Sequence, residues 1–410
     1  MAKLNNPLLR ALRAQDKSGK FDCDAAVISY KTGFPVLDYY LGYKVNVYDE
    51  QDNIIDTYPC IGITAGSYAL FVGKPSSSKT TTAVQVAANI VRNFECGSVI
   101  HFDIEQAMNY TRIQALTKFK MSDMEDKYVL KQGNTSIDEI YNSIMEIYFE
   151  KTKNPELYMY NTGKKNEFGK EIRIFQPTVV ILDSIAAISM HYNENDKNDI
   201  KTISQLEGNT YANRLARDIS QFFTKLLPRL RAANIILLAI NQVKDKIDIG
   251  IVKSAAEFQY MKQNETVPGG WAPKFYAHIF LKFVAEGSSK FTEDDDGFGG
   301  FGVTIDILKS RTNQAGRSCH LIYDKVHGVD SIRSTLRFAK DNGLLNGNKN
   351  KAWIGDDKEN SFSMVDVHQE FRDRPELVRK MYDAVIPLLA NQLSELQEDE
   401  LENEDAVMDY

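Results

Sequence analysis

The chain has 410 residues and a net charge of −7, and 43% of its residues are hydrophobic. This composition is typical of a globular protein with a full core, and the length fits one large domain with appendages or two to three domains. The apolar runs are too short to span a bilayer, no signal peptide is recognisable, and the four cysteines form no C-x-x-C pair. We therefore expect a cytoplasmic protein with reduced thiols and without a membrane span, a disulfide framework or a zinc site.

The predicted elements begin outside the main body of the chain. Residues 1–16 favour a short helix with leucines gathered on one side, and "YKVNVY" followed by "IIDTYPCIGI" predicts a hairpin insert at 43–63. From residue 68 onwards, apolar strands such as "YALFVG", "SVIHFD", "VVILD" and "IILLAIN" alternate with amphipathic helices. This alternation predicts an α/β fold with a central, mostly parallel sheet that is covered on both faces. A second hairpin insert is expected at 158–174.

These elements divide the chain into four expected parts. They are an N-terminal arm and linker, a core that carries both inserts, a small C-terminal region and an acidic tail, at 1–35, 36–335, 336–394 and 395–410. The tail holds eight acidic residues and no basic one, so the rest of the chain is nearly neutral. Such a tail is usually solvated and solubilising, although it can also compete with a polyanion for a basic surface.

The stretch "FVGKPSSSKTTTA" nearly matches the phosphate-binding P-loop, G-x-x-x-x-G-K-[ST], with Ser78 in place of the second glycine. A buried strand precedes the stretch and a helix follows it, as a P-loop requires, because its backbone N–H groups and the helix N-terminus point at the phosphates. Serine keeps the backbone donor and loses only conformational latitude, at a cost of ~1 kcal/mol. The alternative is a serine-rich turn with a surface lysine. The expected phosphate-binding residues are Gly73, Lys74, Pro75, Ser76, Ser77, Ser78, Lys79, Thr80 and Thr81, with Lys79 at the β- and γ-phosphates and Thr80 on Mg²⁺.

Polar residues also stand at the ends of three further predicted strands. Asp183 ends "VVILD" and is expected to hold Mg²⁺, because ligands bind at the carboxyl edge of such sheets. Glu105 in "HFDIEQAM" is expected to activate the attacking water, and strand alternation leaves Asp103 as an alternative. Gln242 ends "IILLAINQ" and is expected to sense the γ-phosphate. Each residue alone is more often an ordinary strand end, and His101 is expected to be packed, but four pieces in this order favour a nucleotide site.

This order of motifs resembles the RecA family of DNA strand-exchange recombinases, most of all its phage UvsX-type members. The resembling stretches, spread between residues 68 and 325, are "FVGKPSSSKTTT", "HFDIEQAM", "VVILDSIAAI", "ANIILLAINQVK", "VPGGWAPKFYA" and "LKSR". The resemblance implies a RecA-like P-loop ATPase core in which Glu105 activates water and Gln242 couples ATP to the DNA-binding loop that follows it. It also implies that Lys309 and Arg311 reach the ATP of a neighbouring subunit, so that hydrolysis depends on assembly.

The resemblance implies further sites outside the P-loop. Residues 200–213 and 243–270 match two loops that order on DNA, and the second of them combines basic and aromatic side chains that suit a single-strand groove. Arg112 stands where the family often has an aromatic residue stacked on adenine. The implied DNA-binding residues are Arg217, Lys244, Lys246, Lys253, Phe258, Tyr260 and Lys262, and the implied subunit-contact residues are Lys274 and Phe275.

The expected function is that of a DNA-dependent ATPase that uses ATP and Mg²⁺. It is expected to form a helical filament on single-stranded DNA, to pair that DNA with a homologous duplex and to exchange strands in recombination, repair and recombination-dependent replication. Its expected partners are both DNA substrates, further copies of the chain, and accessory loading and single-strand-binding proteins, with no membrane, in the host bacterial cytoplasm if the chain is phage-encoded. The alternatives are a ring helicase on the same core and a regulatory ATP-binding module without a DNA substrate.

Overall fold

The computed structural model describes residues 27–133, 135–188, 209–245, 256, 258–286 and 300–393, with the side chains of 209–215 excepted. The predicted helix within 1–16, the acidic tail at 395–410, residues 200–208 of the first expected DNA loop, and Lys246 and Lys253 lie outside the described residues.

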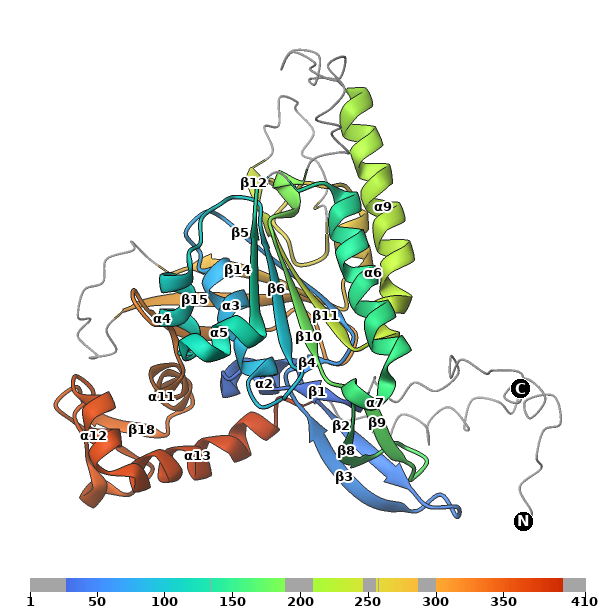
Figure 1. Ribbon diagram of the computed structural model, residues 1–410. Helices are drawn as coiled ribbons and strands as arrows, with labels where there is room; N and C mark the ends of the chain where they lie inside the picture. The colour runs from blue at the N-terminus through green and yellow to red at the C-terminus, as the bar shows by residue number, and fades with distance from the viewer. Residues whose placement is uncertain are drawn as a thin grey trace, which may run out of the picture.

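A nine-stranded sheet forms the centre of the molecule (Figure 1). Six neighbouring strands are parallel, and three antiparallel strands extend the sheet at one edge. The predicted α/β fold with a mostly parallel sheet, as in a RecA-like core, is therefore confirmed. In spatial order the strands are β17 (Gly328–Asp330), β16 (Ser318–Asp324), β15 (Phe301–Ser310), β14 (Ile279–Ala285), β5 (Tyr68–Gly73), β11 (Ile235–Gln242), β10 (Thr178–Asp183), β6 (Ser98–Asp103) and β7 (Tyr128–Gln132).

Helices cover both faces of this sheet and bury two hydrophobic clusters. One face carries α3 (Lys79–Val91), α4 (Tyr110–Thr117) and α5 (Met121–Lys127), and the other carries α6 (Ile137–Lys153), α9 (Asn209–Ala232) and the short α10 (Ala272–Tyr276). All residues of β5 and β10 are buried, because helices pack on both sides of them. At the start of α6, Ser136 and Glu139 form a capping box, in which each side chain accepts the backbone N–H of the other residue. No helix in the described part of the chain is long and apolar enough to cross a membrane.

Two hairpins project together from the amino end of the parallel strands (Figure 1). The first hairpin consists of β2 (Tyr43–Tyr48) and β3 (Ile54–Cys60). The second consists of β8 (Met159–Lys165) and β9 (Glu171–Phe175), and it follows the one-turn helix α7 (Pro155–Tyr158) in the chain. Tyr48 N donates to Glu167 O at 3.0 Å and Tyr58 Oη donates to Lys165 O at 2.8 Å. The structure thus places a hairpin in each of the two expected inserts and packs one against the other.

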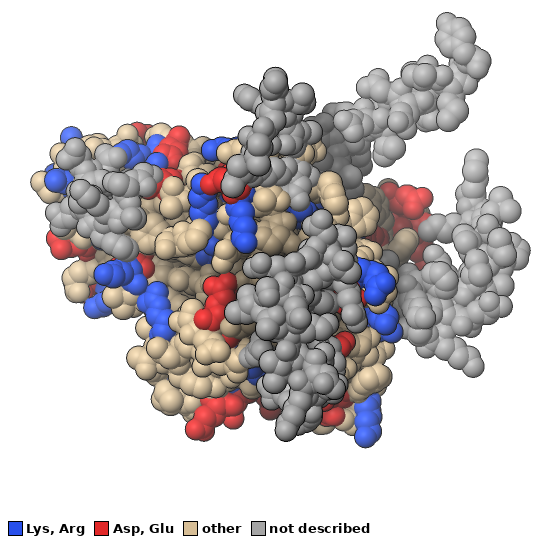
Figure 2. Space-filling view, turned by 90° about the horizontal axis from the view of Figure 1, so that it is seen from above, with Lys and Arg blue, Asp and Glu red and all other residues tan. Residues whose placement is uncertain are grey.

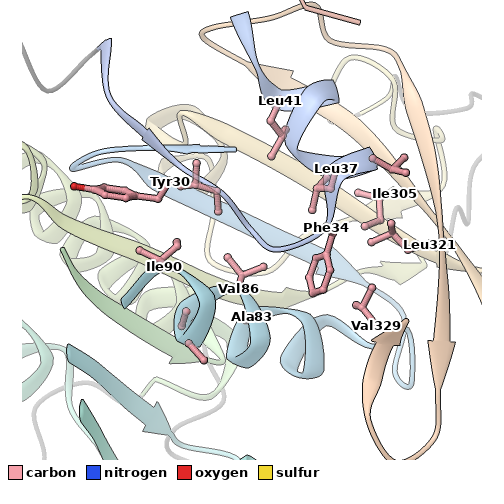
Figure 3. Packing of buried hydrophobic residues seen from close by; sticks show 14 of the residues in the cluster. Tyr30, Phe34, Leu37, Leu41, Ala83, Val86, Ile90, Ile305, Leu321 and Val329 are labelled. Atoms are coloured by element: carbon pink, nitrogen blue, oxygen red, sulfur yellow. The ribbon is translucent and has the colours of Figure 1, made fainter. Parts of the chain in front are cut away.

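The segments before and after the core share one hydrophobic cluster with it. Before β5 come β1 (Ser29–Tyr30), which pairs with β4 (Ile63–Thr64), and α2 (Pro35–Leu41). Figure 3 shows Phe34 and Leu37 between α3 on one side and β15 and β16 on the other. After β17 come α11 (Ser331–Asp341), β18 (Leu345–Asn348), β19 (Lys351–Ile354), α12 (Val367–Asp373) and α13 (Pro375–Ala390), whose buried residues belong to the same cluster.

Candidate nucleotide site and the adjoining loop ends

The four motif pieces meet at the carboxyl edge of the parallel strands. Asp183 is aligned with Asp103 on the neighbouring strand, and Gln242 is aligned with Gly73, the first residue of the P-loop motif. Because parallel strands present their carboxyl ends at one edge, residues that are far apart in the chain become neighbours here. Context therefore separates this stretch from an isolated serine-rich turn.

The P-loop stretch contains two serines in the left-handed backbone region. Ser76 has φ 61° and Ser78 has φ 65°, conformations that favour glycine. Ser78 is the residue that precedes α3, and it makes no side-chain cap hydrogen bond. Ser78 thus adopts a left-handed backbone conformation that glycine would adopt without strain.

Lys79 lies inside the P-loop rather than on its surface. Its ammonium donates to Lys74 O at 2.8 Å and to Ser77 Oγ at 3.3 Å, and the residue is only 8% exposed. Burial lowers the pKa of Lys79, while the carboxylates of Asp183 and Glu105 act in the opposite direction. A partly desolvated ammonium surrounded by a loop of backbone amides is suited to bind phosphate oxygens.

Thr80 and Asp183 form the adjacent oxygen cluster. Thr80 Oγ1 donates to Asp183 Oδ2 at 2.6 Å, and Asp183 is buried. Burial raises the pKa of Asp183 to about 6, and the nearby Glu105 and Asp103 carboxylates add to this effect, whereas the Thr80 hydrogen bond and Lys79 oppose it. A hydroxyl and a carboxylate beside a phosphate-binding loop are hard oxygen donors of the type that Mg²⁺ prefers, so the residues present fit this ion.

The structure distinguishes the two acidic residues that follow β6. Asp103 is fully buried and accepts hydrogen bonds from Ala107 N at 3.1 Å, Met108 N at 2.9 Å and Gln132 Nε2 at 2.7 Å. Its carboxylate therefore holds the turn after β6. Glu105 lies in that turn, is exposed, and accepts from Ser184 Oγ at 2.6 Å and more weakly from Gln242 Nε2 at 3.5 Å. Of the two, Glu105 is the carboxylate that a water molecule can reach.

His101 is packed beneath these carboxylates. It is fully buried, its Nδ1 lies 2.9 Å from Tyr128 Oη, and burial lowers its pKa to about 4. A neutral, buried ring that pairs with a tyrosine is a packing residue, as the sequence suggests.

A cavity of about 430 Å³ opens beside the P-loop. The rings of Phe301 and Tyr323 stack in its wall, with their centroids 5.4 Å apart. Arg112, which is expected to contact the adenine base of the nucleotide, lines the same cavity and donates to Val326 O. An aromatic wall, a cation and a carboxylate next to a phosphate loop suit a nucleoside. The lining residues are Ser76, Ser78, Thr81, Arg112, Ala285, Phe301, Tyr323, Asp324 and Lys325.

Two ion pairs connect the ends of the second expected DNA loop to the core, one to the P-loop and one to β14. Within this expected loop, residues 243–270, β12 (Lys244–Asp245) pairs with β13 (Glu265–Thr266). Lys74 in the P-loop donates to Asp245 Oδ2 at 3.0 Å, and Lys282 on β14 donates to Glu265 at 2.7 Å. The Lys282–Glu265 pair is buried on both sides, whereas the Lys74–Asp245 pair is exposed, so the former contributes the more rigid anchor.

The described members of the expected DNA-binding set differ in exposure. The side chain of Arg217, on α9, is 69% exposed, Tyr260 is 52% exposed, and Lys244 and Lys262 are also exposed. Phe258 instead packs edge-on against Phe280, with ring centroids 5.2 Å apart, and is half-buried. The structure thus presents cations and one tyrosine to solvent around the ends of the two loops.

Lys309 and Arg311 lie at the end of the strands opposite the P-loop. Arg311 N donates to His278 O, and His278 N donates to Tyr68 O, the first residue of β5, whereas the P-loop follows its last residue, Gly73. At about 3.3 Å per residue the two ends are roughly 16 Å apart along the strand. Within one chain the pair is therefore remote from Lys79.

The two expected subunit-contact residues differ in solvent exposure. Lys274 is fully buried, and its ammonium donates to Val267 O at 3.4 Å within its own subunit. In a single chain the Lys274 side chain does not reach the surface, and the expected contact of this residue with a neighbouring subunit stays a prediction. Phe275 is 59% exposed, and its carbonyl accepts from Lys309 Nζ at 2.6 Å, which places Phe275 and the basic pair on one surface.

Several residues of this site escape a reading of the sequence. Ser184 positions Glu105, Gln132 holds Asp103, and Asn241 donates to Pro268 O at 2.8 Å. Their only local signal is that each stands at or next to the end of an apolar strand. The aromatic wall at Phe301 and Tyr323 has no such signal, because it is assembled from the two antiparallel strands β15 and β16.

The chain is similar at low identity to several proteins named RecA. No family model matches the chain. The chain is 27% identical over 205 residues to "Protein RecA" of Mannheimia haemolytica, which covers 48% of this chain and 49% of that protein. It is 23% identical over 345 residues to "Protein RecA" of Aquifex pyrophilus, covering 82% and 83%. It is also 23% identical over 354 residues to "Protein RecA" of Nostoc punctiforme, covering 84% and 82%. The chain thus spans about half the length of the first relative and about four-fifths of the other two. The matches support a relation to RecA and do not address a phage subclass.

Proposed function

We propose that this chain is a RecA-family DNA recombinase of the phage UvsX type, an ATPase that depends on DNA and forms helical filaments on single-stranded DNA. The observation that carries the proposal is the position of Gln242. Its amide lies within 3.5 Å of Glu105 at the nucleotide site, and the ribbon of β12 and β13 begins two residues later. One side chain thus stands between the site of hydrolysis and the base of a DNA-binding loop.

The P-loop residues bind the nucleotide. Lys79 supplies the ammonium for the β- and γ-phosphates, and the backbone N–H groups around Ser77 and Ser78 supply donors. Thr80 and Asp183 hold Mg²⁺, which when bound neutralises charge on the phosphates. Phe301, Tyr323 and Arg112 receive the nucleoside in the adjoining cavity, which supports the proposal because the cavity and the P-loop are continuous.

Glu105 is the general base for the attacking water. Its exposure and its hydrogen bond from Ser184 support this role, because the serine fixes the carboxylate without closing it off from solvent. Gln242 couples the state of the γ-phosphate to the ends of the DNA-binding loop. Its side-chain amide faces the nucleotide, and its backbone leads into β12.

Lys309 and Arg311 act on the ATP of a neighbouring subunit. Their distance from the P-loop of their own chain supports an arrangement in trans, and the exposed Phe275 beside them supplies an apolar contact for that neighbour. Hydrolysis then requires assembly, because no single chain contains a complete site.

Single-stranded DNA binds at the ends of the two loops, where Arg217, Lys244 and Lys262 neutralise phosphates and Tyr260 offers an aromatic ring. Lys246 and Lys253 belong to the same proposed surface by sequence. Phosphate contacts imply strong dependence on salt and little dependence on DNA sequence. In the filament the bound strand is paired with a homologous duplex and exchanged, with loading and single-strand-binding proteins as accessory partners.

The rate of ATP hydrolysis with and without single-stranded DNA, at two salt concentrations, tests the proposal. We expect stimulation by DNA that weakens at the higher salt. Hydrolysis that ignores DNA would instead identify a regulatory ATP-binding module. A closed hexamer that unwinds forked duplex would identify a ring helicase. Co-sedimentation with long single strands and electron microscopy separate open filaments from rings.

A further inference from the structure

Trp271 is one of two tryptophans in the chain, and it is 62% exposed. Tryptophan has a large apolar surface and is the residue type most enriched among residues that dominate binding energy. Its position in the fold decides which kind of partner this ring meets.

The chain holds Trp271 at the carboxyl edge of the sheet. The residues before it, Gly269 and Gly270, have φ +92° and +76°, which only glycine adopts without strain. A Cβ on Gly270 would lie 3.3 Å from the Cβ of Ala216 on α9, so the two segments approach closely. Asn241, next to Gln242, fixes the start of this turn through its bond to Pro268 O. The ring therefore stands on a backbone that is anchored to the strand end at the nucleotide site.

The side of the ring that faces the subunit is occupied by a buried cation. The ammonium of Lys274 lies 5.5 Å from the centroid of the Trp271 ring, and Lys274 is fully buried. This cation–π contact restrains the indole while most of its surface remains in solvent. An aromatic ring that is already ordered loses little conformational entropy when a flat partner stacks on it.

The segments that adjoin Trp271 carry exposed cations. Arg217 directly follows Ala216, the residue that Gly270 approaches, and its side chain is 69% exposed. Lys244 is exposed and is paired with Thr266, which stands five residues before Trp271. Figure 2 looks down on this edge and shows both basic (blue) and acidic (red) side chains on it. An ordered, exposed aromatic ring with exposed cations on the adjoining segments matches the chemistry of single-strand binding, in which bases stack and phosphates are neutralised.

We propose that Trp271 stacks on a base of the bound single-stranded DNA, while Arg217 and Lys244 contact the phosphates on either side. The proposal deepens the function proposed above and rests on it. Phe275 stands one turn further along α10, and its N–H donates to Trp271 O at 2.9 Å, so the two exposed aromatic residues lie on the same side of this turn. The proposal assigns Trp271 to the DNA and Phe275, whose carbonyl accepts from Lys309, to the next subunit.

The two tryptophans provide a direct test in the full-length chain. Oligo(dT) is titrated in the presence of Mg²⁺ and a non-hydrolysable ATP analogue, and both the anisotropy of labelled DNA and the tryptophan emission are recorded. Trp353 lies on β19 in the C-terminal region and is half-buried. The Trp353→Phe variant should keep the quenching that stacking causes, and Trp271→Phe should lose it. Trp271→Ala should bind oligo(dT) about tenfold more weakly or worse, and Trp353→Ala should bind it as the wild type does.

An abasic oligonucleotide of the same length distinguishes the contribution of the bases to binding from that of the phosphates. It should bind the wild type and Trp271→Ala equally and leave the emission of Trp271 unchanged. Equal quenching by abasic and normal DNA would overturn the stacking proposal, as would undiminished affinity of Trp271→Ala for oligo(dT). An emission change on raising the protein concentration without DNA would assign the ring to a contact with a second copy instead. If the wild type binds no oligo(dT) at all, the proposed function fails together with this inference, whereas binding without Trp271 involvement removes the inference alone.

Discussion

Thr80 and Asp183 stand 103 positions apart in the chain, and Thr80 Oγ1 donates a hydrogen bond of 2.6 Å to Asp183 Oδ2. The bond links the first turn of α3 to the end of β10. It brings together the two residues that the sequence separately assigns to Mg²⁺, and it lies next to Lys79, whose ammonium is held within the same loop.

Replacing Lys79 by alanine should abolish ATP hydrolysis and ATP-dependent assembly while leaving the fold intact. Among the described residues the ammonium donates to the loop itself, to Lys74 O and Ser77 Oγ, so its loss removes no direct hydrogen bond to a carboxylate. Lys153→Ala is the control, because Lys153 is exposed at the end of α6 and its variant should retain turnover. ATPase assays and thermal melting measure both effects. Near-normal turnover of Lys79→Ala would show that this loop is not the nucleotide site.

Glu105→Gln and Asp103→Asn should have different consequences. Glu105→Gln should bind ATP and DNA and hydrolyse at least about a hundredfold more slowly, because the base is lost. Asp103→Asn should instead lose about 1–3 kcal/mol of unfolding free energy, because an amide NH₂ would face the donors of Ala107, Met108 and Gln132. Single-turnover hydrolysis and urea unfolding distinguish the two variants. A slow, fully stable Asp103→Asn beside an active Glu105→Gln would reverse the assignment.

A Lys309→Ala/Arg311→Ala double variant should bind ATP almost normally as a monomer and fail to hydrolyse it. Mixing it with Lys79→Ala should restore part of the activity, because some interfaces then join an intact P-loop to an intact basic pair. Co-sedimentation on DNA checks that the Lys79 variant enters the filament. If it enters and the mixture remains inactive, Lys309 and Arg311 do not act in trans, and a role in stability or in DNA binding replaces the proposed one.

Ser78→Gly should stabilise the protein by about 1 kcal/mol, because the backbone at this position has φ 65° and glycine adopts that conformation without a steric penalty. Ser77→Gly is the control. Ser77 Oγ donates to Lys74 O at 2.8 Å and its backbone is not left-handed, so this variant should lose stability. Urea unfolding of both variants measures the difference. A less stable Ser78→Gly would mean that the serine side chain makes a contribution larger than the strain.

The unfolding free energy should fall as the pH is lowered from 6.5 towards 4, in part through His278. Burial, with the nearby cations of Arg311, Arg231 and Lys309, lowers the pKa of His278 from 6.5 to about 4. Between these values the unfolded chain binds a proton that the folded chain does not, so acid favours unfolding, by about 2 kcal/mol at pH 5.

His278→Asn tests the origin of this effect. In the folded protein His278 Nδ1 accepts from Tyr68 N at 3.2 Å, and an asparagine carbonyl supplies an acceptor that does not titrate. Urea unfolding at a series of pH values should show a flatter profile between pH 6.5 and 4.5 for the variant. Profiles of equal slope would place the acid sensitivity in other groups.

The sequence by itself determined the sheet and the edge at which the site lies. Alternating apolar strands and amphipathic helices fix a parallel sheet, and polar residues that end such strands must gather at its carboxyl edge, as Asp103, Asp183 and Gln242 do. Both relations follow from local periodicity, which neighbouring residues in the chain suffice to set.

Only the tertiary structure decided what each polar side chain does at that edge. The sequence favours Glu105 as the base and leaves Asp103 as an alternative. In the structure the two differ because the strand β6 ends at Asp103, whose carboxylate accepts a hydrogen bond from Gln132 of β7. Lys274 and Phe275 are neighbours in sequence, yet one is fully buried and the other is 59% exposed, because α10 packs one of its sides against the core. Burial and hydrogen-bond partners depend on contacts between residues that are distant in the chain, and these arise only when the fold has brought the elements together.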